Sequence, residues 1–164
     1  PLLVQLFLVY YGSGQFRHEL DSIGLWTLFR EAHFCAIFVL ALNTAAYSAE
    51  IFSGAIRSVD KNQIEAGRAV GMTSLVLYRR IVLPQAMRIS WTSYSNEIIF
   101  IMQATSLVSI ITVLDLTGVA GRIISKTFAI YEVYIAIALM YLAITYTMVF
   151  IFSRLEKRLN RHKI

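Results

Sequence analysis

Two carboxylic acids stand inside long apolar stretches of this sequence, and they are the residues best suited to chemistry. Glu50 is the one acid of Phe34–Ile56, and Glu97 is the one acid of Ile89–Leu114. Ionisable side chains are costly inside a membrane and are usually retained there for function. The pair therefore predicts either contact with a cationic group of a solute or the paired carboxylates of an intramembrane enzyme.

Helical spacing gives both acids polar neighbours. Asn43, Tyr47 and Glu50 follow one another at i, i+4 and i+7, which places them on one helix face. We predict that such faces line a path for a solute. The alternative interpretation is that each acid pairs with a helix terminus, with a loop arginine such as Arg57 or Arg88, or with a second subunit. The residues predicted to form this polar path are Asn43, Tyr47, Glu50, Asn96, Glu97 and Gln103, with Ser93 on the face of Glu97.

The enzyme hypothesis lacks the remaining parts of an active site. The three histidines, His18, His33 and His162, have no metal-ligand spacing, and no nucleophile accompanies the acids. The single Cys35 cannot form a disulfide within the chain. The sequence therefore favours a solute path over catalysis.

The elements that must position these residues are membrane-spanning helices. Hydrophobic residues make up 57% of the chain and charged residues 15%, whereas soluble domains carry about 25% charged residues. Phe34–Ile56, Ile89–Leu114 and Val133–Phe152 contain 23, 26 and 20 residues, and about 20 suffice to cross a bilayer. Pro1–Tyr11 resembles part of another span. We expect an all-α integral membrane protein, because unpaired backbone groups are not tolerated in lipid.

The distribution of basic residues predicts the orientation of these spans. Eleven of the 15 basic residues lie in the segment 57–88 or after Phe152, and four lie in the other two connections. Positive charge is retained on the cytoplasmic side, so this segment and the C-terminus are expected there. The net charge of +5 therefore indicates membrane topology rather than nucleic-acid binding.

The segment 57–88 carries helix start and stop signals. Asp60 can cap a helix that begins near Lys61, and Gln63 completes a capping-box pattern. Gly71 can end that helix in a left-handed conformation. A second helix is expected after Thr73 or Ser74, with a kink or boundary at Pro84. The alternative is an amphipathic helix on the bilayer surface, which the arginines of the segment would suit.

Two other segments lie outside the spans. Gly118 and Gly121 fall in the external connection and are expected in a turn. Arg154–Arg161 is predicted to be a helix end held at anionic lipid headgroups.

The segment 57–88 also carries a motif of fixed spacing. It contains Glu65-Ala66-Gly67, then Gly71, then Ile81-Val82-Leu83-Pro84 after nine residues. This motif resembles the loop signature of the permeases of bacterial ATP-binding-cassette importers, with Gly67 in place of an alanine. Leu42–Val59, Tyr94–Glu97 and the opening Pro1–Gln5 are similar to the polar amino acid branch of that family. The resemblance covers essentially the whole chain.

The resemblance implies a single permease domain over residues 1–164, of the five-span type with the first span and part of the second missing. Residues 57–88 would be its cytoplasmic coupling loop, the element that docks into a groove of a separate ATPase. The residues implied in coupling are Glu65, Ala66, Gly67, Gly71, Leu83 and Pro84.

The partners and the location also follow from the resemblance. It implies an ATP-binding subunit, a sister permease subunit, an extracytoplasmic solute-binding protein and an amino acid substrate, with lipid around the spans and no nucleic acid. The protein would be a multi-pass component of the bacterial inner membrane with a cytoplasmic C-terminus. No cofactor is expected in this chain, because it contains no Gly-x-x-x-x-Gly-Lys-Ser/Thr phosphate loop. ATP with Mg²⁺ would bind in the ATPase.

Polar amino acids are the implied substrates, with basic amino acids or opines as the narrower expectation. A secondary transporter or channel fragment that needs no ATPase is the alternative. It predicts inverted repeats and broken helices at the middle of the membrane. The sequence shows neither, and that alternative leaves the spacing of the loop motif unexplained.

Overall fold

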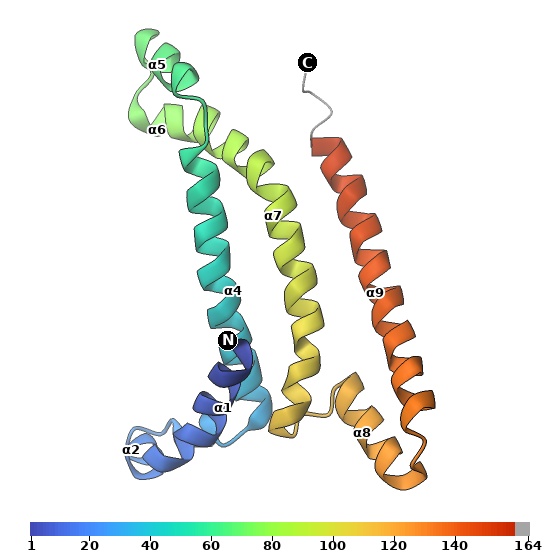
Figure 1. Cartoon of the computed structure of the whole chain (residues 1–164). Helices are drawn as coiled ribbons and strands as arrows, with labels where there is room; N and C mark the ends of the chain where they lie inside the picture. The colour runs from blue at the N-terminus through green and yellow to red at the C-terminus, as the bar shows by residue number, and fades with distance from the viewer. Residues whose placement is uncertain (160–164) are drawn as a thin grey trace. The chain divides into compact units, whose positions relative to one another are not determined.

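The computed structural model describes residues 1–159, and all regular secondary structure in that range is helical (Figure 1). Asn160 and Arg161 of the predicted headgroup-binding tail lie outside the described residues. The helices are α1 Leu2–Gly12, the 3₁₀ segment η1 Ser13–Phe16, α2 Arg17–Ser22, α3 Trp26–Phe29, α4 Ala32–Arg57, α5 Lys61–Ala69, α6 Ser74–Leu77, the π-helical segment η2 Tyr78–Val82, α7 Leu83–Ala104, the 3₁₀ segment η3 Thr105–Ile111, α8 Leu116–Thr127 and α9 Ile130–Leu159.

Three helical stretches of the described chain are long and apolar enough to cross a membrane: Ala32–Arg57, Ser74–Ile111 and Ile130–Arg158. They confirm the three predicted spans but not all of their bounds. The second stretch begins earlier than predicted, because the second helix of the loop continues directly into the span. It ends before Leu114, because Thr112 adopts a left-handed conformation with φ of 71°.

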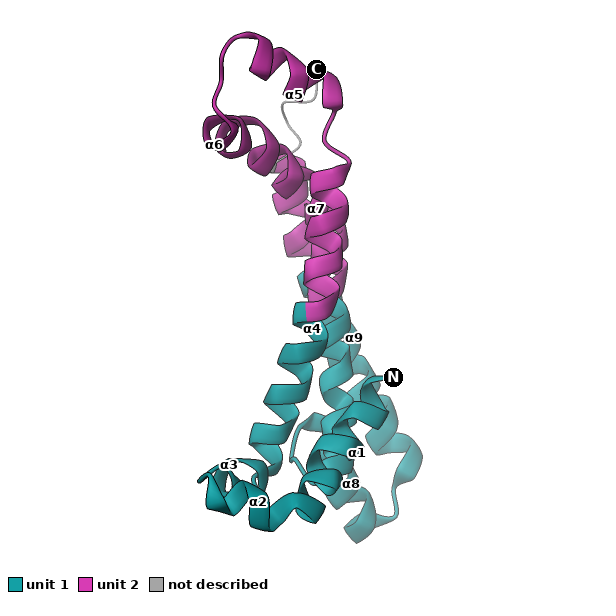
Figure 2. Ribbon diagram, turned by 90° about the vertical axis from the view of Figure 1, so that its left-hand side faces the viewer, with its two compact units in different colours: residues 1–45, 99–148 teal, residues 46–98, 149–164 magenta. Residues whose placement is uncertain are grey.

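The chain groups into two compact units, each built from separate segments (Figure 2). Unit 1 contains residues 1–45 and 99–148, and unit 2 contains residues 46–98 and 149–164. Helices α4, α7 and α9 contribute residues to both units. The predicted coupling loop therefore lies within unit 2.

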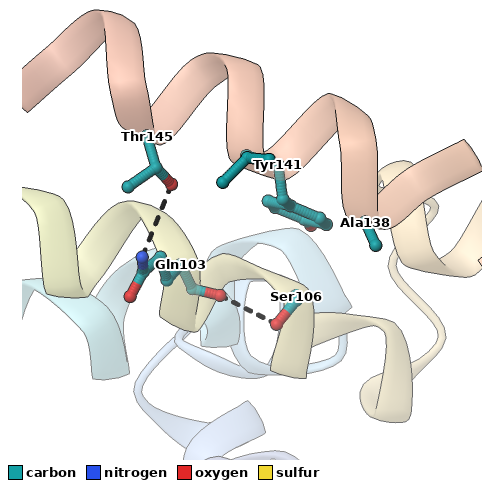
Figure 3. Close-up of a pocket in the computed structure, with 6 residues that line it drawn as sticks. Gln103, Ser106, Ala138, Tyr141 and Thr145 are labelled. Atoms are coloured by element: carbon teal, nitrogen blue, oxygen red, sulfur yellow. Dashed lines mark hydrogen bonds between the residues drawn. The ribbon is translucent and has the colours of Figure 1, made fainter. Parts of the chain in front are cut away.

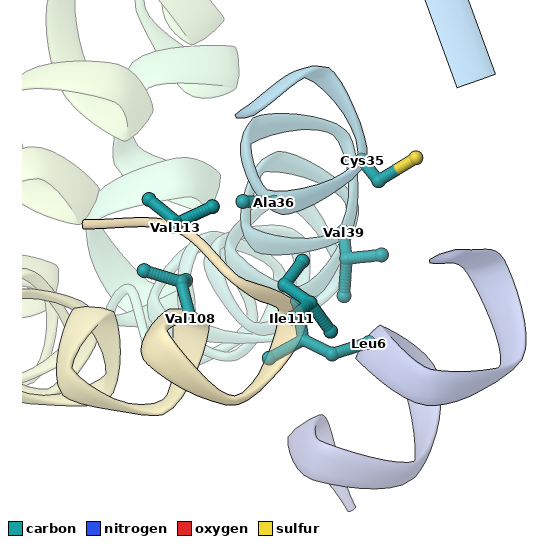
Figure 4. Close-up of a cluster of buried hydrophobic side chains, with 7 residues drawn as sticks. All are labelled: Leu6, Cys35, Ala36, Val39, Val108, Ile111 and Val113. Atoms are coloured by element: carbon teal, nitrogen blue, oxygen red, sulfur yellow. The ribbon is translucent and has the colours of Figure 1, made fainter. Parts of the chain in front are cut away.

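Unit 1 is held together by a small apolar core (Figure 4). Leu6 of α1 and Ile111 at the end of η3 are fully buried, in one cluster with residues from the start of α4. Burial of such side chains contributes about 1.5–3 kcal/mol each. The core members are Leu6, Cys35, Ala36, Val39, Val108, Ile111 and Val113.

The connection between the second and third spans forms a helix where a turn was expected. Gly118 and Gly121 both lie in α8, so the turn prediction is wrong. Asp115 caps this helix, because its Oδ1 accepts a hydrogen bond of 2.8 Å from the Gly118 backbone N–H. A Cβ atom at residue 118 would lie 2.7 Å from the Val113 carbonyl oxygen. Glycine is therefore needed there for close approach rather than for a turn.

In unit 2 the end of α9 contacts α7. Trp91 Nε1 donates to the Phe152 carbonyl at 3.5 Å, and the two rings meet edge to face. Thr92 Oγ1 donates to Glu156 at 2.6 Å. These contacts fix the last turns of α9 beside the beginning of the second span.

Candidate functional site

The predicted coupling loop, residues 57–88, contains a capped first helix. Asp60 Oδ1 accepts a hydrogen bond of 2.9 Å from the Asn62 backbone N–H, which confirms the predicted cap of α5. The capping-box role predicted for Gln63 is wrong. Its Oε1 accepts instead from Nε2 of Gln85, on the first turn of α7. A side chain expected to serve its own helix thus joins two helices.

The end of α5 follows the predicted glycine stop. Gly71 has φ of +79°, in the left-handed region. Its N–H donates to the Arg68 carbonyl at 3.0 Å, and the Met72 N–H donates to the Gly67 carbonyl at 3.1 Å. These two bonds form a Schellman motif, which satisfies carbonyls at the end of a helix. The chain then turns back toward the membrane span.

The second helix of the loop is continuous with the span. Thr73 is the N-cap of α6, which passes into the π-helical segment η2 and then into α7. The Leu83 N–H bonds to the Tyr78 carbonyl, five residues earlier. Pro84 is the second residue of α7, so the predicted boundary is a change from π to α geometry within one helical path.

The loop has an apolar core of its own. It joins the end of α4 to α6, η2 and α7, with Ile64 of α5 and Met72 packed against it. Gly67 is buried in the same region, where a Cβ atom would lie 3.1 Å from Ile81 Cδ1 and 3.2 Å from Leu77 Cδ1. The loop is therefore a folded body rather than a flexible connection. Its core residues are Ala55, Val59, Leu77, Val82 and Ala86.

The remaining five residues implied in coupling are exposed on this body: Glu65, Ala66, Gly71, Leu83 and Pro84. Two apolar residues beside them escaped the sequence reasoning. Val70 is 75% exposed and Leu75 is 79% exposed. The sequence could have indicated them, because both are apolar residues near Gly71, in a turn where solvent-exposed positions usually carry polar residues.

Glu50 lines a cavity of about 340 Å³ between α4 and α7 in unit 2. Ser93, predicted on the face of Glu97, lines the same cavity, together with Ser58 and Ser90. The cavity thus brings one acid of the first span beside hydroxyl groups of the second. It can offer a carboxylate and several hydrogen-bonding groups to a polar solute.

Glu97 lies one turn further along α7 and is buried, with 8% of its surface exposed. Its Oε1 atom has no hydrogen-bond partner among the described residues, and the same holds for the hydroxyl of Ser95. A buried charged group without a partner is costly. Asn96, the adjacent predicted residue, is exposed, as is Tyr47 on α4. Of the predicted residues in unit 2, Glu97 is the one withdrawn from the surface.

The two predicted path residues of unit 1 are engaged in separate contacts. Asn43 Nδ2 on α4 donates to Gln5 Oε1 on α1 at 3.1 Å. Gln103 Nε2 donates to Thr145 Oγ1 on α9 at 3.4 Å (Figure 3). Unit 1 thus holds Asn43 and Gln103, and unit 2 holds Tyr47, Glu50, Asn96 and Glu97.

Gln103 lies on a second cavity, of about 360 Å³, between the end of the second span and α9. Ser106, Tyr141 and Thr145 line it with Gln103 (Figure 3). The Tyr141 hydroxyl also donates to Asp115 Oδ2 at 3.3 Å. The sequence reasoning missed the α9 residues. Their signal was the spacing of Tyr141 and Thr145 at i and i+4, which gives the last span a polar face.

The chain matches a known family over residues 1–161. This family is the binding-protein-dependent transport system inner membrane component. The chain therefore belongs to this family, whose members are multi-pass proteins of the inner membrane.

Its relatives include the nopaline transport system permease protein of Agrobacterium fabrum, 51% identical over 99% of this chain and 67% of that protein. The octopine transport system permease protein of Rhizobium meliloti is 46% identical over 95% of this chain and 63% of its own length. The histidine/lysine/arginine/ornithine transport system permease protein of Salmonella typhimurium is 41% identical, over 99% and 69%.

A solved structure has the same fold. The crystal structure of an amino acid ABC transporter with histidines superposes with a TM-score of 0.83 at 37% identity, covering 96% of this chain and 69% of that one. The predicted all-α permease fold is thereby confirmed. This chain spans about two thirds of the length of these relatives, from 63% to 69%.

Proposed function

We propose that this chain is the permease subunit of an ATP-driven importer for polar amino acids, with basic amino acids or opines as substrates. The coupling loop carries this proposal. It is a folded body at the end of two spans, and it exposes the residues of a motif typical of ATPase docking. A secondary transporter or channel has no use for such a loop.

The coupling loop docks on a separate cytoplasmic ATPase. Glu65, Ala66, Gly71, Leu83 and Pro84 belong to its exposed surface, and Gly67 serves coupling indirectly, by letting α5 approach η2 closely. ATP with Mg²⁺ binds and is hydrolysed in that subunit, so this chain carries no cofactor and no catalytic residue. The loop and the C-terminus face the cytoplasm, in agreement with the excess of basic residues there.

The transport cycle is a shift of the permease between two conformations. ATP binding favours one state of the ATPase, and the docked loop passes that preference to the spans, which open alternately to the two sides of the membrane. An extracytoplasmic solute-binding protein delivers the solute, and a sister permease subunit completes the path. Both partners are supported by the nature of the family and by the similarity to amino acid and opine permeases.

The solute path is formed by the polar residues of the spans. Glu97 and Glu50 contact the cationic group of the solute, because Glu97 Oε1 is buried without a hydrogen-bond partner within residues 1–159 and Glu50 lies in a cavity lined by serines. Asn43, Tyr47, Asn96 and Gln103 supply neutral hydrogen-bonding groups along the path. A cationic amino group or guanidinium would give the Glu97 carboxylate the partner that its surroundings lack.

The experiment that tests this function is reconstitution of the full-length permease in vesicles. The permease should co-purify with an ATPase encoded for the same system, and ATP hydrolysis should rise when the loaded binding protein is added. Basic amino acids and opines should stimulate hydrolysis more than acidic ones. Solute uptake that continues without any ATPase would instead support the secondary transporter.

A further inference from the structure

The direct chain path from the coupling helix α5 to the span α7 runs through weak geometry. It passes the turn at Gly71, the single turn of α6 and the π-helical segment η2. π-Helical turns are rare, occur mostly as single-turn bulges inside α-helices and are frequent at functional sites. Pro84 follows directly and has no N–H to donate, so the beginning of α7 also lacks a helical hydrogen bond. A displacement carried along this path alone would be absorbed by its deformation.

A side-chain contact bypasses that path. Gln63 of α5 accepts a hydrogen bond from Gln85 of α7, 22 residues later and just beyond η2. In addition, Gly67 lets α5 lie against Leu77 and Ile81. The amide pair therefore joins the docking helix to the span without involving the π-helical turn.

We propose that Gln63 and Gln85 form a brace, a pair of positioning residues that carries displacement of α5 directly to α7. The proposal rests on the proposed function, since it requires that an ATPase moves α5. The brace is not a main source of stability, because the pair lies at the surface where water competes for both amides. Its role is to make α5 and the first turn of α7 move together, so that each ATP is converted into motion of the span.

The first test uses Gln63→Leu and Gln85→Leu in the full-length permease, reconstituted with its ATPase and binding protein. Each variant should still co-purify with the ATPase and hydrolyse ATP. Solute transported per ATP hydrolysed should fall, by at most about fivefold, because an exposed hydrogen bond contributes no more than about 1 kcal/mol. Asn62→Leu, on the adjacent exposed residue, is the matched control and should leave that ratio unchanged.

A second test asks whether coupling requires the hydrogen bond itself or only a glutamine at each of the two positions. Gln63→Glu should retain coupling, because a carboxylate still accepts from the Gln85 amide. Gln85→Glu should retain it as well, because the Gln63 amide can turn over and donate. The two substitutions together leave two acceptors and no donor, so the double variant should lose coupling although each single variant keeps it. Asn62→Glu combined with Gln85→Glu brings the same charge and should stay coupled.

The outcomes distinguish the brace from the proposed function. Unchanged transport per ATP in both leucine variants, or in the double glutamate variant, would overturn the brace while leaving the importer intact. Loss of the ATPase from these variants would also overturn it, since the pair would then act in docking. A wild-type permease that binds no ATPase would overturn the proposed function itself.

Discussion

The proposed coupling loop and the membrane spans differ in how many buried polar side-chain atoms lack a hydrogen-bond partner among the described residues. In the loop, Asp60 caps α5 and Gln63 bonds to Gln85. In the spans α4 and α7, four buried side-chain atoms have no hydrogen-bond partner among the described residues. They belong to Asn43, Thr44, Ser95 and Glu97.

This difference indicates which part of the molecule is complete by itself. A buried polar atom without a partner costs about 1–3 kcal/mol, so a chain retains such atoms where something else supplies the partner. The loop has an apolar core and a helix cap made by its own residues. Under the proposed function, a solute, water or another subunit would supply these partners in the spans.

Gly71→Val is the change that should break the loop most severely. A β-branched residue cannot easily adopt the φ of +79° found there, and the left-handed conformation alone costs about 1–2 kcal/mol for a residue other than glycine. We expect the Schellman motif to open and co-purification of the ATPase to fall about tenfold or more. The measurement is the ratio of ATPase to permease after affinity purification.

Gly121→Val in α8 is the matched control. Gly121 has open space around its Cα, and its φ is not positive, so the same side chain should fit there without loss of the ATPase. Wild-type association of the Gly71→Val permease would show that the left-handed turn has no part in docking.

Glu97→Gln should have the largest effect in the spans. The amide keeps the shape of the side chain but removes the charge, and a hydrogen bond to a charged group is worth about 1.5–3 kcal/mol. Uptake of cationic amino acids should therefore fall about 10-fold to 100-fold, while ATPase association stays unchanged. Glu50→Gln should have a smaller effect, because Glu50 is exposed and has serines beside it.

Glu132→Gln, at the exposed start of α9, is the control for loss of an acid outside the path. Radiolabelled uptake by vesicles measures all three variants, with a neutral amino acid as the competing solute. If both span variants kept the wild-type rate and the wild-type solute preference, the acids would have a structural role instead.

Local rules explain why most of the loop could be predicted from the sequence. The cap at Asp60 and the left-handed Gly71 depend on residues within one turn of each other. Gln63 was misassigned because its partner is 22 residues away, and the local capping-box pattern pointed to a different donor, the backbone N–H of the N-cap residue. Single-sequence patterns carry no information about such tertiary competition.

The spans were predicted for a different reason, since length and hydropathy identify a membrane helix without any contact. Those properties do not determine which faces meet. The Gln103–Thr145 contact and the polar face of α9 therefore escaped prediction. The helix α8 was missed because two glycines outweighed the cap at Asp115, although Gly118 is required there by the nearby Val113 carbonyl.

Gly67→Ala should have the smallest effect of these substitutions, and it tests how closely the loop is packed. The new Cβ would lie 3.1 Å from Ile81 Cδ1 and 3.2 Å from Leu77 Cδ1, both ends of flexible side chains that can shift by a few tenths of an ångström. We expect a loss of stability below about 1 kcal/mol and normal ATPase association, whereas Gly67→Leu should cost about 1–3 kcal/mol by overpacking. Thermal unfolding of the purified complex in detergent measures both. Equal melting temperatures for the leucine variant and the wild type would mean that α5 does not pack against η2. The loop would then not be a body that is packed by its own residues.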